Sequence, residues 1–477
     1  MLIHLIGICG TGMGSLAGLL RDAGHQVQGS DENVYPPMST MLRAKGIVLM
    51  EGYKASNLQP APDLVVVGNI ASRGNPEAQE VLERGLEHLS MPQALARFFL
   101  SSRHSIVVAG THGKTTTTAM IARMLLAAGS DPSFLVGGVL KDLDQSYRLG
   151  GGEHFVIEGD EYETSFFDKG SKFLHYMPRT AILTSVEYDH AEMFPSLDDV
   201  KAAFAAFLRL VPPADDGGAL IVCADDPLAW GMARECRGAI VPYGMGPEAR
   251  LRGREVSSGP EGMTFQVQDG GEDLGLFRMA ATGHHNLRNA LSAVAVGRRV
   301  GLTPDAIRAG LGAFGGVKRR QEIRGVAAGV TVVDDFAHHP TAVRETIAAM
   351  KARFPGHRLW AIFEPRTNTT RRDVFQEEYA RAFDGADEVI VAPVDHPERA
   401  PEGRRFDVTR LMTALRERGL SAREEPAGVD AIVQYVAERS RRGDVVLAMS
   451  NGGFGGIHDR LLAALSTRAA AGAPGGA

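Results

Sequence analysis

The sequence has few cysteines, no long uninterrupted apolar run and no large excess of one charge. Its three cysteines, Cys9, Cys223 and Cys236, show no paired spacing, which argues against a disulfide framework and indicates a reducing compartment. No apolar run reaches the length of about 20 residues that a membrane-spanning helix needs. Glycines interrupt the apolar first residues and no basic segment precedes them, so we expect no signal peptide. We therefore predict a cytoplasmic protein with no membrane partner.

The charge balance and the length narrow the class of protein further. The chain has 51 lysines and arginines against 57 acidic residues, a net charge of −6. That balance gives no electrostatic footprint for nucleic acid. A chain of 477 residues is too long for one hydrophobic core, so we expect two to four domains. The hydrophobic content of 44% and the charged content of 23% are ordinary for a globular protein.

The stretch from Ser105 to Thr118 is the most informative part of the sequence. An apolar strand over Ile106–Ala109 leads through a glycine-containing turn into a helix that starts near Lys114. The free backbone N–H groups and the dipole at such a helix start attract anions. Lys114 adds a point charge for phosphates, and the Thr115 hydroxyl can bind Mg²⁺. The context therefore predicts a phosphate-binding loop.

This loop departs from the usual motif at one position. The usual spacing places a glycine at 108, where this chain has Val108, so the loop is a variant that begins at Gly110. The alternative interpretation is an ordinary strand-to-helix turn with a polar helix start. We favour the phosphate loop, because Gly-Lys-Thr directly after an apolar strand rarely arises otherwise.

The N-terminal segment has the pattern of a second nucleotide-binding unit. A strand over Leu2–Ile8 enters a glycine-rich turn, a helix follows, and a second strand over Gln26–Gly29 ends at Ser30 and Asp31. Asp31 lies about 20 residues beyond the glycines, where such folds place a ribose-binding carboxylate. The strict Gly-x-Gly-x-x-Gly pattern fails at Ser15. An oxidoreductase-type Rossmann domain and a glycine-rich packing turn both remain open at this point.

Carboxylates follow the next buried strand, Phe155–Glu158. They include Asp160, Glu161 and Glu163. A strand that ends in a carboxylate downstream of a phosphate loop is typical of a Mg²⁺ site. The spacing does not say which carboxylate binds the metal, and a solvated acidic turn is the alternative.

A Tyr-Asp-His sequence follows a further apolar strand, Thr180–Val186, and ends at His190. Mg²⁺ prefers oxygen ligands, and imidazole is a poor partner for it. On this chemistry alone, His190 is more typical of a helix start than of a metal site.

A third unit follows a glycine-then-basic linker around Gly315–Glu322. Its strands are expected at Val330–Val333, Leu359–Phe363, Glu388–Ala392 and Val445–Met449. The alternation of strands and helices throughout the chain predicts an α/β fold with doubly wound or related domains. We place domains at residues 1–99, 100–315 and 316–465, and we expect the Ala/Gly/Pro-rich residues 466–477 to be a disordered tail.

Several motifs, taken in order, resemble the Mur ligase family, whose members are ATP-dependent amide-forming enzymes of peptidoglycan synthesis. The resemblance extends from about residue 1 to residue 462. The motifs that carry it are Gly-Thr-His-Gly-Lys-Thr-Thr, Ile-Glu-Gly-Asp-Glu, Tyr-Asp-His, Gly-His-His-Asn-Leu-Arg-Asn, Val-Lys-Arg-Arg-Gln-Glu and Asp-Asp-Phe-Ala-His-His-Pro. The resemblance implies a Rossmann-like N-terminal domain, a central P-loop ATPase domain and a C-terminal Rossmann-like domain.

The resemblance also implies substrates and binding residues. The N-terminal glycine-rich turn is similar to that of members that bind UDP-N-acetylmuramate. The residues implied for this UDP-sugar are Gly10, Thr11, Gly12, Met13, Ser30, Asp31, Asn69 and Arg73. Those implied for ATP are Gly110, Thr111, His112, Gly113, Lys114, Thr115, Thr116, His285, Asn286, Asn289, Arg320 and Asp335.

The same resemblance implies the catalytic set and its metal ions. Thr115 and Glu158 are implied as Mg²⁺ ligands, and His190 as a ligand of a second Mg²⁺. The catalytic residues implied are Lys114, Glu158, His190 and Arg320. The implied reaction is phosphoryl transfer from ATP to a carboxylate, followed by attack of an amine.

Three stretches suggest which amine is used: Asp160–Asp168, Phe363–Thr369 and Met449–Gly456. They are similar to family members that attach the tripeptide L-alanyl-γ-D-glutamyl-meso-diaminopimelate in cell-wall recycling. The alternative within the family is the addition of L-alanine. Arg366 and Asn368 are candidates to bind the peptide carboxylates. A structural salt bridge is the alternative for Arg366, and the sequence favours neither.

Two alternatives lie outside the family's chemistry. A dehydrogenase would use the first domain, and a nucleotide switch or scaffold would bind ATP without forming a bond. We expect small-molecule substrates, and a monomer or weak homo-oligomer. Domain closure about residues 316–322 is also expected.

Overall fold

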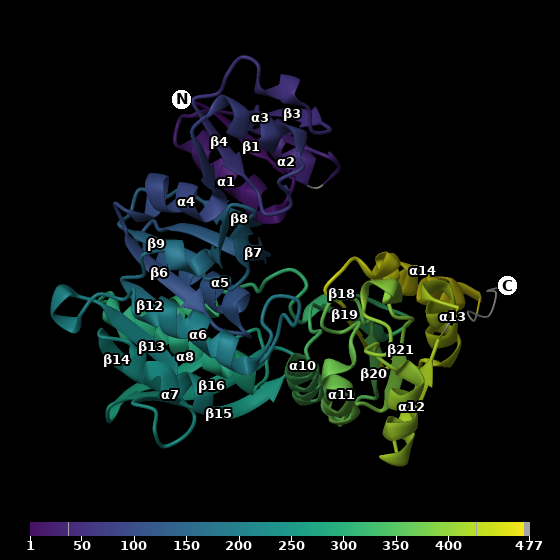
Figure 1. Cartoon of the computed structure of the whole chain (residues 1–477). Helices are drawn as coiled ribbons and strands as arrows, with labels where there is room; N and C mark the ends of the chain where they lie inside the picture. Colours follow the sequence, from purple (N-terminus) through teal and green to yellow (C-terminus); the bar gives the residue numbers. More distant parts are fainter. Residues whose placement is uncertain (37, 426, 472–477) are drawn as a thin grey trace.

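The computed structural model describes residues 1–36, 38–425 and 427–471, which form three sheet-centred regions in chain order (Figure 1). The first region contains a parallel sheet of order β3-β2-β1-β4-β5. Its strands are β1 (Leu2–Ile6), β2 (Gln26–Asp31), β3 (Val48–Glu51), β4 (Leu64–Val67) and β5 (His88–Ser90). Its helices are α1 (Thr11–Asp22), α2 (Met38–Ala44), α3 (Pro76–Arg84) and α4 (Met91–Leu95).

The central region is built on a ten-stranded mixed sheet of order β17-β16-β15-β14-β13-β12-β6-β9-β7-β8. Its strands are β6 (His104–Ala109), β7 (Ser133–Leu140), β8 (Gln145–Arg148), β9 (His154–Glu158), β12 (Thr180–Leu183), β13 (Ala219–Cys223), β14 (Ala239–Gly244), β15 (Leu251–Gly259), β16 (Gly262–Asp269) and β17 (Glu272–Met279). A separate hairpin pairs β10 (Glu163–Ser165) with β11 (Asp168–Ser171). The helices are α5 (Lys114–Ala127), α6 (Leu197–Leu208), α7 (Pro227–Met232), α8 (His284–Arg299) and α9 (Pro304–Gly312).

The C-terminal region has a six-stranded sheet of order β18-β19-β23-β20-β21-β22, in which only the β18–β19 pair is antiparallel. Its strands are β18 (Glu322–Ala327), β19 (Val330–Asp335), β20 (Leu359–Phe363), β21 (Glu388–Val391), β22 (Ser421–Glu424) and β23 (Val445–Met449). Its helices are α10 (Pro340–Arg353), α11 (Gln376–Ala382), α12 (Val408–Glu417), α13 (Val429–Arg439) and α14 (Ile457–Ala471). Figure 1 shows α10 and α11 on the side that faces the central region.

The predicted α/β class is confirmed, and each strand that we expected from the sequence is present within a few residues of its expected bounds. The main difference is at the C-terminus. Residues 466–471, which we expected to belong to a disordered tail, continue helix α14. Alanine has the highest helix propensity, and the alanines at 469–471 are compatible with continuation of the preceding helix. Residues 472–477 lie outside the described part of the chain.

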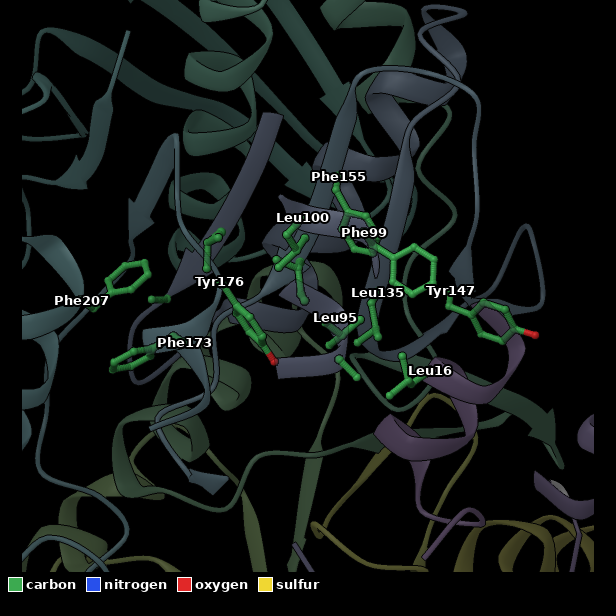
Figure 2. Packing of buried hydrophobic residues seen from close by; sticks show 14 of the residues in the cluster. Leu16, Leu95, Phe99, Leu100, Leu135, Tyr147, Phe155, Phe173, Tyr176 and Phe207 are labelled. Carbon is green, nitrogen blue, oxygen red and sulfur yellow. The ribbon is translucent and has the colours of Figure 1, made fainter. Parts of the chain in front are cut away.

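One hydrophobic core joins the first region to the central region. Figure 2 shows Leu16 of α1 beside Leu95 and Leu135, with Phe99 and Phe155 next to them. The Phe99 and Phe155 ring centroids are 6.2 Å apart. The boundary that we expected after residue 99 therefore crosses a single packed cluster.

Candidate nucleotide-binding and catalytic site

The phosphate loop joins the end of β6 to the start of α5. Gly110 and Gly113 have φ angles of 130° and 82°, a backbone conformation that residues with a side chain rarely adopt. A Cβ at Gly110 would lie 2.2 Å from Thr184 Oγ1, and one at Gly113 would lie 2.5 Å from Asn289 Oδ1. Val108, where the usual motif has glycine, is buried in β6. The variant loop therefore has glycine at 110 and 113, the two positions where the φ angle and the close neighbours leave no room for a side chain.

The Lys114 ammonium lies within this loop and is surrounded by acceptors. Its Nζ donates to Gly110 O at 2.7 Å and lies 2.9 Å from Glu161 Oε2. Burial disfavours the charged form, but the carboxylates of Glu161, Asp160 and Glu158 outweigh it and raise the pKa of Lys114. Lys114 is therefore a fixed positive charge beside the free N–H groups of α5, as a phosphate site requires.

Thr115 and Glu158 provide adjacent oxygen ligands. Thr115 Oγ1 donates to Glu158 Oε1 at 2.8 Å, and the Gly137 N–H donates to Glu158 Oε2 at 2.8 Å. Burial raises the pKa of Glu158, while the nearby Lys114 charge acts in the opposite direction. Mg²⁺ prefers hydroxyl and carboxylate oxygens, so this pair fits a magnesium ion.

His190 joins the same cluster through Glu161. Its Nε2 lies 3.3 Å from Glu161 Oε1, and its ring centroid lies 4.2 Å from that of Tyr162. Burial disfavours the imidazolium, but the Glu161 hydrogen bond and the Asp189 charge raise the pKa of His190. His190 has a φ of 56° and lies in a loop; it is not at a helix start. Glu161, a buried carboxylate, thus links Lys114 to His190.

Three of the residues implied for ATP, His285, Asn286 and Asn289, lie in the first turns of α8. Asn289 approaches the phosphate loop at Gly113, and its Nδ2 donates to Asn286 Oδ1 at 3.3 Å. His285 Nε2 lies 3.2 Å from Gln321 Nε2, at the start of the C-terminal region. The structure therefore brings the start of α8 against both the loop and the linker.

Arg320 of the linker and Asp335 at the end of β19 lie close to the same place. The Arg320 guanidinium stacks on Phe336 at 4.6 Å. Burial lowers the pKa of Arg320, and the charges of Asp335 and Glu158 oppose that shift. The Asp335 carboxylate accepts bonds from the backbone N–H groups of Gln321 and Ala337, each at 2.8 Å. Through the bond from Gln321, this carboxylate anchors the end of the linker.

The residues proposed for the UDP-sugar surround the glycine turn between β1 and α1. Asp31 Oδ2 accepts from the Cys9 N–H at 2.8 Å, so this carboxylate shapes the turn. Ser15, at the position of the missing third glycine, donates to Thr11 O at 2.9 Å and lies 3.1 Å from Ser146 Oγ of the central region. Gly10 lies in this turn, Gly12 and Met13 lie in the first turn of α1, and Ser30 lies near the end of β2. Asn69 and Arg73 lie on the loop after β4.

The peptide-binding candidates lie on the loop after β20. Arg366 is 41% exposed, and its nearest carboxylates are 3.7 Å (Asp395) and 4.0 Å (Glu364) away. Asn368 Oδ1 accepts from Arg371 Nη1 at 3.1 Å. Arg366 is thus only loosely paired and can reach a ligand carboxylate.

Polar contacts connect this loop to the catalytic cluster. Thr369 Oγ1 donates to Asp189 Oδ1 at 3.3 Å, and Arg372 Nη1 donates to Ala191 O at 3.2 Å. Asp189 precedes His190, which contacts Glu161 and through it Lys114. A continuous series of contacts therefore joins the loop after β20 to the phosphate loop.

Sequence reasoning did not single out three of these side chains. Glu161 was one of several carboxylates without a distinguishing spacing. Glu187 directly precedes the Tyr-Asp-His sequence, and His339 lies in Asp-Asp-Phe-Ala-His-His-Pro. In the structure Glu187 Oε2 lies 2.8 Å from His112 Nε2 and 3.4 Å from His339 Nδ1. The His-His-Pro sequence was the available signal, but its partner is far away in the chain.

Within the described part of the chain, no helix combines the length and the apolar character needed to cross a bilayer.

Three protein-family models match this chain in order. They are the Mur ligase family catalytic domain over residues 2–103, the Mur ligase middle domain over 108–297 and the Mur ligase glutamate ligase domain over 319–452.

The chain is similar from end to end to characterised ligases. It is 41% identical over 473 residues to the UDP-N-acetylmuramate–L-alanyl-γ-D-glutamyl-meso-2,6-diaminoheptandioate ligase of Escherichia coli, covering 99% of this chain and 100% of that protein. It is 34% identical to the UDP-N-acetylmuramate–L-alanine ligase of Solibacter usitatus, covering 98% and 95%. The crystal structure of a murein peptide ligase from Psychrobacter arcticus superposes with a TM-score of 0.71 at 38% identity, covering 98% and 99%.

Proposed function

The chain belongs to the Mur ligase family, and on that basis we propose that it is an ATP-dependent ligase that joins L-alanyl-γ-D-glutamyl-meso-diaminopimelate to UDP-N-acetylmuramate. The end-to-end likeness to a tripeptide ligase, which exceeds the likeness to an L-alanine ligase, carries the choice of acceptor. We assign the UDP-sugar to residues 1–99, ATP to 100–315 and the peptide to 316–465.

The reaction needs an activated carboxyl group. A carboxylate does not condense with an amine in neutral water, because it has no leaving group. ATP therefore transfers its γ-phosphoryl group to the lactyl carboxylate of UDP-N-acetylmuramate. The peptide amine then attacks the acyl phosphate, a C–N bond forms, and phosphate leaves as the amine loses a proton.

The residues around Lys114 suit the first step. Phosphoryl transfer depends mainly on positioning and on neutralising charge. Lys114 is a buried cation held by Gly110 O and Glu161, and we assign it to the transferred phosphoryl group. We assign Arg320, which reaches in from the linker, to the same phosphates.

We assign Mg²⁺ to Thr115 and Glu158, with His190 serving a second ion. Bound there, Mg²⁺ would neutralise phosphate charge. The oxygen pair Thr115–Glu158 supports the first of these assignments directly, since the two oxygens are 2.8 Å apart. Glu161 positions both Lys114 and His190 relative to that pair.

Arg366 and Asn368 are assigned to the peptide. The tripeptide carries several carboxylates, and arginine binds carboxylates bidentately. The loose pairing of Arg366 and the contact of its loop with Asp189 support this role. The amine of a peptide held at this loop would face the catalytic cluster.

The test is phosphate release with ATP, Mg²⁺ and UDP-N-acetylmuramate, with either L-alanine or the tripeptide added. We expect release with the tripeptide and a product that contains both substrates. Release with L-alanine alone would make the protein the biosynthetic enzyme. Nucleotide binding without substrate-dependent release would indicate a switch protein, and a change in nicotinamide absorbance would indicate a dehydrogenase.

Arg366→Ala tests the assignment of the acceptor site. Loss of a charged hydrogen bond costs roughly 1.5–3 kcal/mol, so the KM for the tripeptide should rise about 10- to 100-fold with little change in the KM for ATP. Arg404→Ala is a matched control, because Arg404 is an exposed arginine of the same domain that pairs with Asp373. An unchanged tripeptide KM in Arg366→Ala would remove Arg366 from the peptide site.

A further inference from the structure

A histidine–glutamate–histidine cluster lies where the phosphate loop meets the C-terminal region. It consists of His112 in the loop, Glu187 after β12, and His339 at the start of α10. One ligand atom from each residue lies within 4.8 Å of the others. None of these atoms belongs to the Thr115–Glu158 pair assigned to magnesium.

Hydroxyl side chains hold His112 and Glu187 in place. The His112 N–H donates to Ser185 Oγ at 3.0 Å, and the Glu187 N–H donates to Thr111 Oγ1 at 2.8 Å. Glu187 Oε1 accepts from Thr341 Oγ1 at 3.1 Å. The geometry is therefore set before any ligand binds.

The hydrogen bonds of His339 fix its tautomer. Its Nε2 lies 3.3 Å from Tyr188 O, and a carbonyl can only accept, so Nε2 carries the proton. Its Nδ1 accepts from the Thr341 N–H at 3.3 Å, so Nδ1 carries a lone pair. A ring N–H bound to a backbone carbonyl, with the other nitrogen free to donate electrons, is the arrangement found in metal-binding histidines.

This tautomer leaves two electron-pair donors facing each other. His339 Nδ1 and Glu187 Oε2 are 3.4 Å apart with no proton between them, and His112 Nε2 is 2.8 Å from the same oxygen. Two ligands of one tetrahedral zinc ion are roughly 3.3 Å apart when the bonds are about 2.0–2.1 Å. The 3.4 Å between His339 Nδ1 and Glu187 Oε2 is close to that value, whereas the 2.8 Å between His112 Nε2 and Glu187 Oε2 is that of a hydrogen bond, which a bound ion would replace. The long bond from the Thr341 N–H is the interaction that a metal would replace.

We propose that His112, Glu187 and His339 form a binding site for a zinc-like divalent cation that clasps the C-terminal region to the phosphate loop. Two imidazoles and one carboxylate suit Zn²⁺ and similar borderline ions better than Mg²⁺. Because His112 and Glu187 belong to the central region and His339 to the C-terminal region, the bound ion restrains their relative motion.

The binding experiment is a competition between the full-length protein and a chromophoric chelator for Zn²⁺, with millimolar Mg²⁺ present. We expect one Zn²⁺ per chain in the wild type. In His339→Asn and Glu187→Gln the affinity for Zn²⁺ should be lower than in the wild type by at least about tenfold. Asparagine at 339 keeps an oxygen that can cap α10, so loss of the fold is not the expected cause. Wild-type affinity in His339→Asn would overturn the proposal.

Two control variants locate the ion. His357→Asn makes the same change at an exposed histidine of the same region and should bind Zn²⁺ as the wild type does. His190→Asn removes the imidazole next to Glu161 and should also keep its affinity. A loss in His190→Asn equal to that in His339→Asn would place the zinc in the magnesium cluster and overturn the proposal.

Trypsin cleavage of the linker tests the clasp itself. Lys318, Arg319 and Arg320 offer cleavage sites there, and Lys318 is 48% exposed. Zn²⁺ should slow cleavage several-fold in the wild type and leave the rate in His339→Asn unchanged. Equal rates with and without Zn²⁺ in the wild type would contradict the clasp. Neither measurement depends on ligase turnover.

Discussion

The two joints between the three regions are built differently. The joint between the first and central regions is apolar, with Leu16, Leu95, Phe99 and Phe155 in one buried cluster (Figure 2). The joint between the central and C-terminal regions is made largely of hydrogen bonds and ion pairs. The two core clusters of the C-terminal region consist of residues from Ala327 onward.

Individual contacts illustrate the polar joint. Glu345 of α10 pairs with Arg288 of α8 at 2.9 Å, and Thr282 Oγ1 donates to Ala349 O at 3.2 Å. Burial of apolar surface does not depend on charge or ligands, whereas charged contacts respond to phosphate, metal ions and pH. We therefore expect the first joint to hold the N-terminal and central regions together and the second to let the C-terminal region move.

Removal of the Lys114 charge, near the polar joint, should give the largest effect, a loss of turnover. Lys114→Ala removes the buried cation, so turnover should fall by roughly 10³-fold or more while the fold remains intact. Steady-state phosphate release and circular dichroism would measure the two quantities. Lys201→Ala on α6, which removes a surface lysine paired with Asp198, is the control. Near-normal turnover in Lys114→Ala would refute the phosphate-loop assignment.

The apolar joint should be the more sensitive to truncation of a side chain. Phe99 is 2% exposed, and Phe99→Ala should lower the free energy of unfolding by about 3–5 kcal/mol. Thr369→Val at the polar joint removes a hydrogen bond to the Asp189 carboxylate and should cost less, about 1.5–3 kcal/mol. Urea unfolding of both variants makes the comparison. If Thr369→Val were the more destabilising change, our distinction between the two joints would be wrong.

The polar joint should also respond to acid. Burial alone would raise the pKa of Glu345, but the hydrogen bond from His285 and the charge of Arg288 lower it from 4.5 to about 2. Its stabilising contribution is therefore complete above about pH 4.5 and lost as the pH falls through about 2.

Glu345→Gln should reduce stability by about 1–2 kcal/mol at pH 7. The difference from wild type should shrink as the pH falls below about 4.5. Urea unfolding over a pH series measures this change, with the exposed Glu417→Gln as a control. A constant difference at all pH values would show that Glu345 does not stabilise the joint through its charge.

The smallest expected effect is a change in the distance between the central and C-terminal regions when ligands bind. Gly316, Arg319 and Gln321 have φ angles of 96°, 62° and 47°, an unusual backbone for a non-glycine residue. We expect nucleotide and UDP-sugar to change the distance between labels at positions 305 and 417 by several ångström. The distance between positions 83 and 305 should stay constant. Equal changes in both distances would show that both joints move.

Local patterns predicted the elements well, because a strand, a glycine turn and a helix start are all encoded by neighbouring residues. Asp31 and the Lys114 loop are examples. The sequence did not reveal that Leu16 and Phe155 share a core, because that contact depends on how two sheets pack. It also did not single out Glu161 among four nearby carboxylates, because only burial distinguishes it. The meeting of His112 with His339 spans two regions and has no local signal.

The shared core has a consequence for how the chain is made. The cluster around Leu16 and Phe99 is completed by residues as far along as Ala233. At roughly 5–20 residues per second, a ribosome needs about 7–27 s to extend the chain from residue 99 to residue 233. During that interval helix α1 exposes apolar side chains that strands β7 and β8 of the central region later cover. The C-terminal region, with cores of its own, emerges last and folds without waiting for a partner.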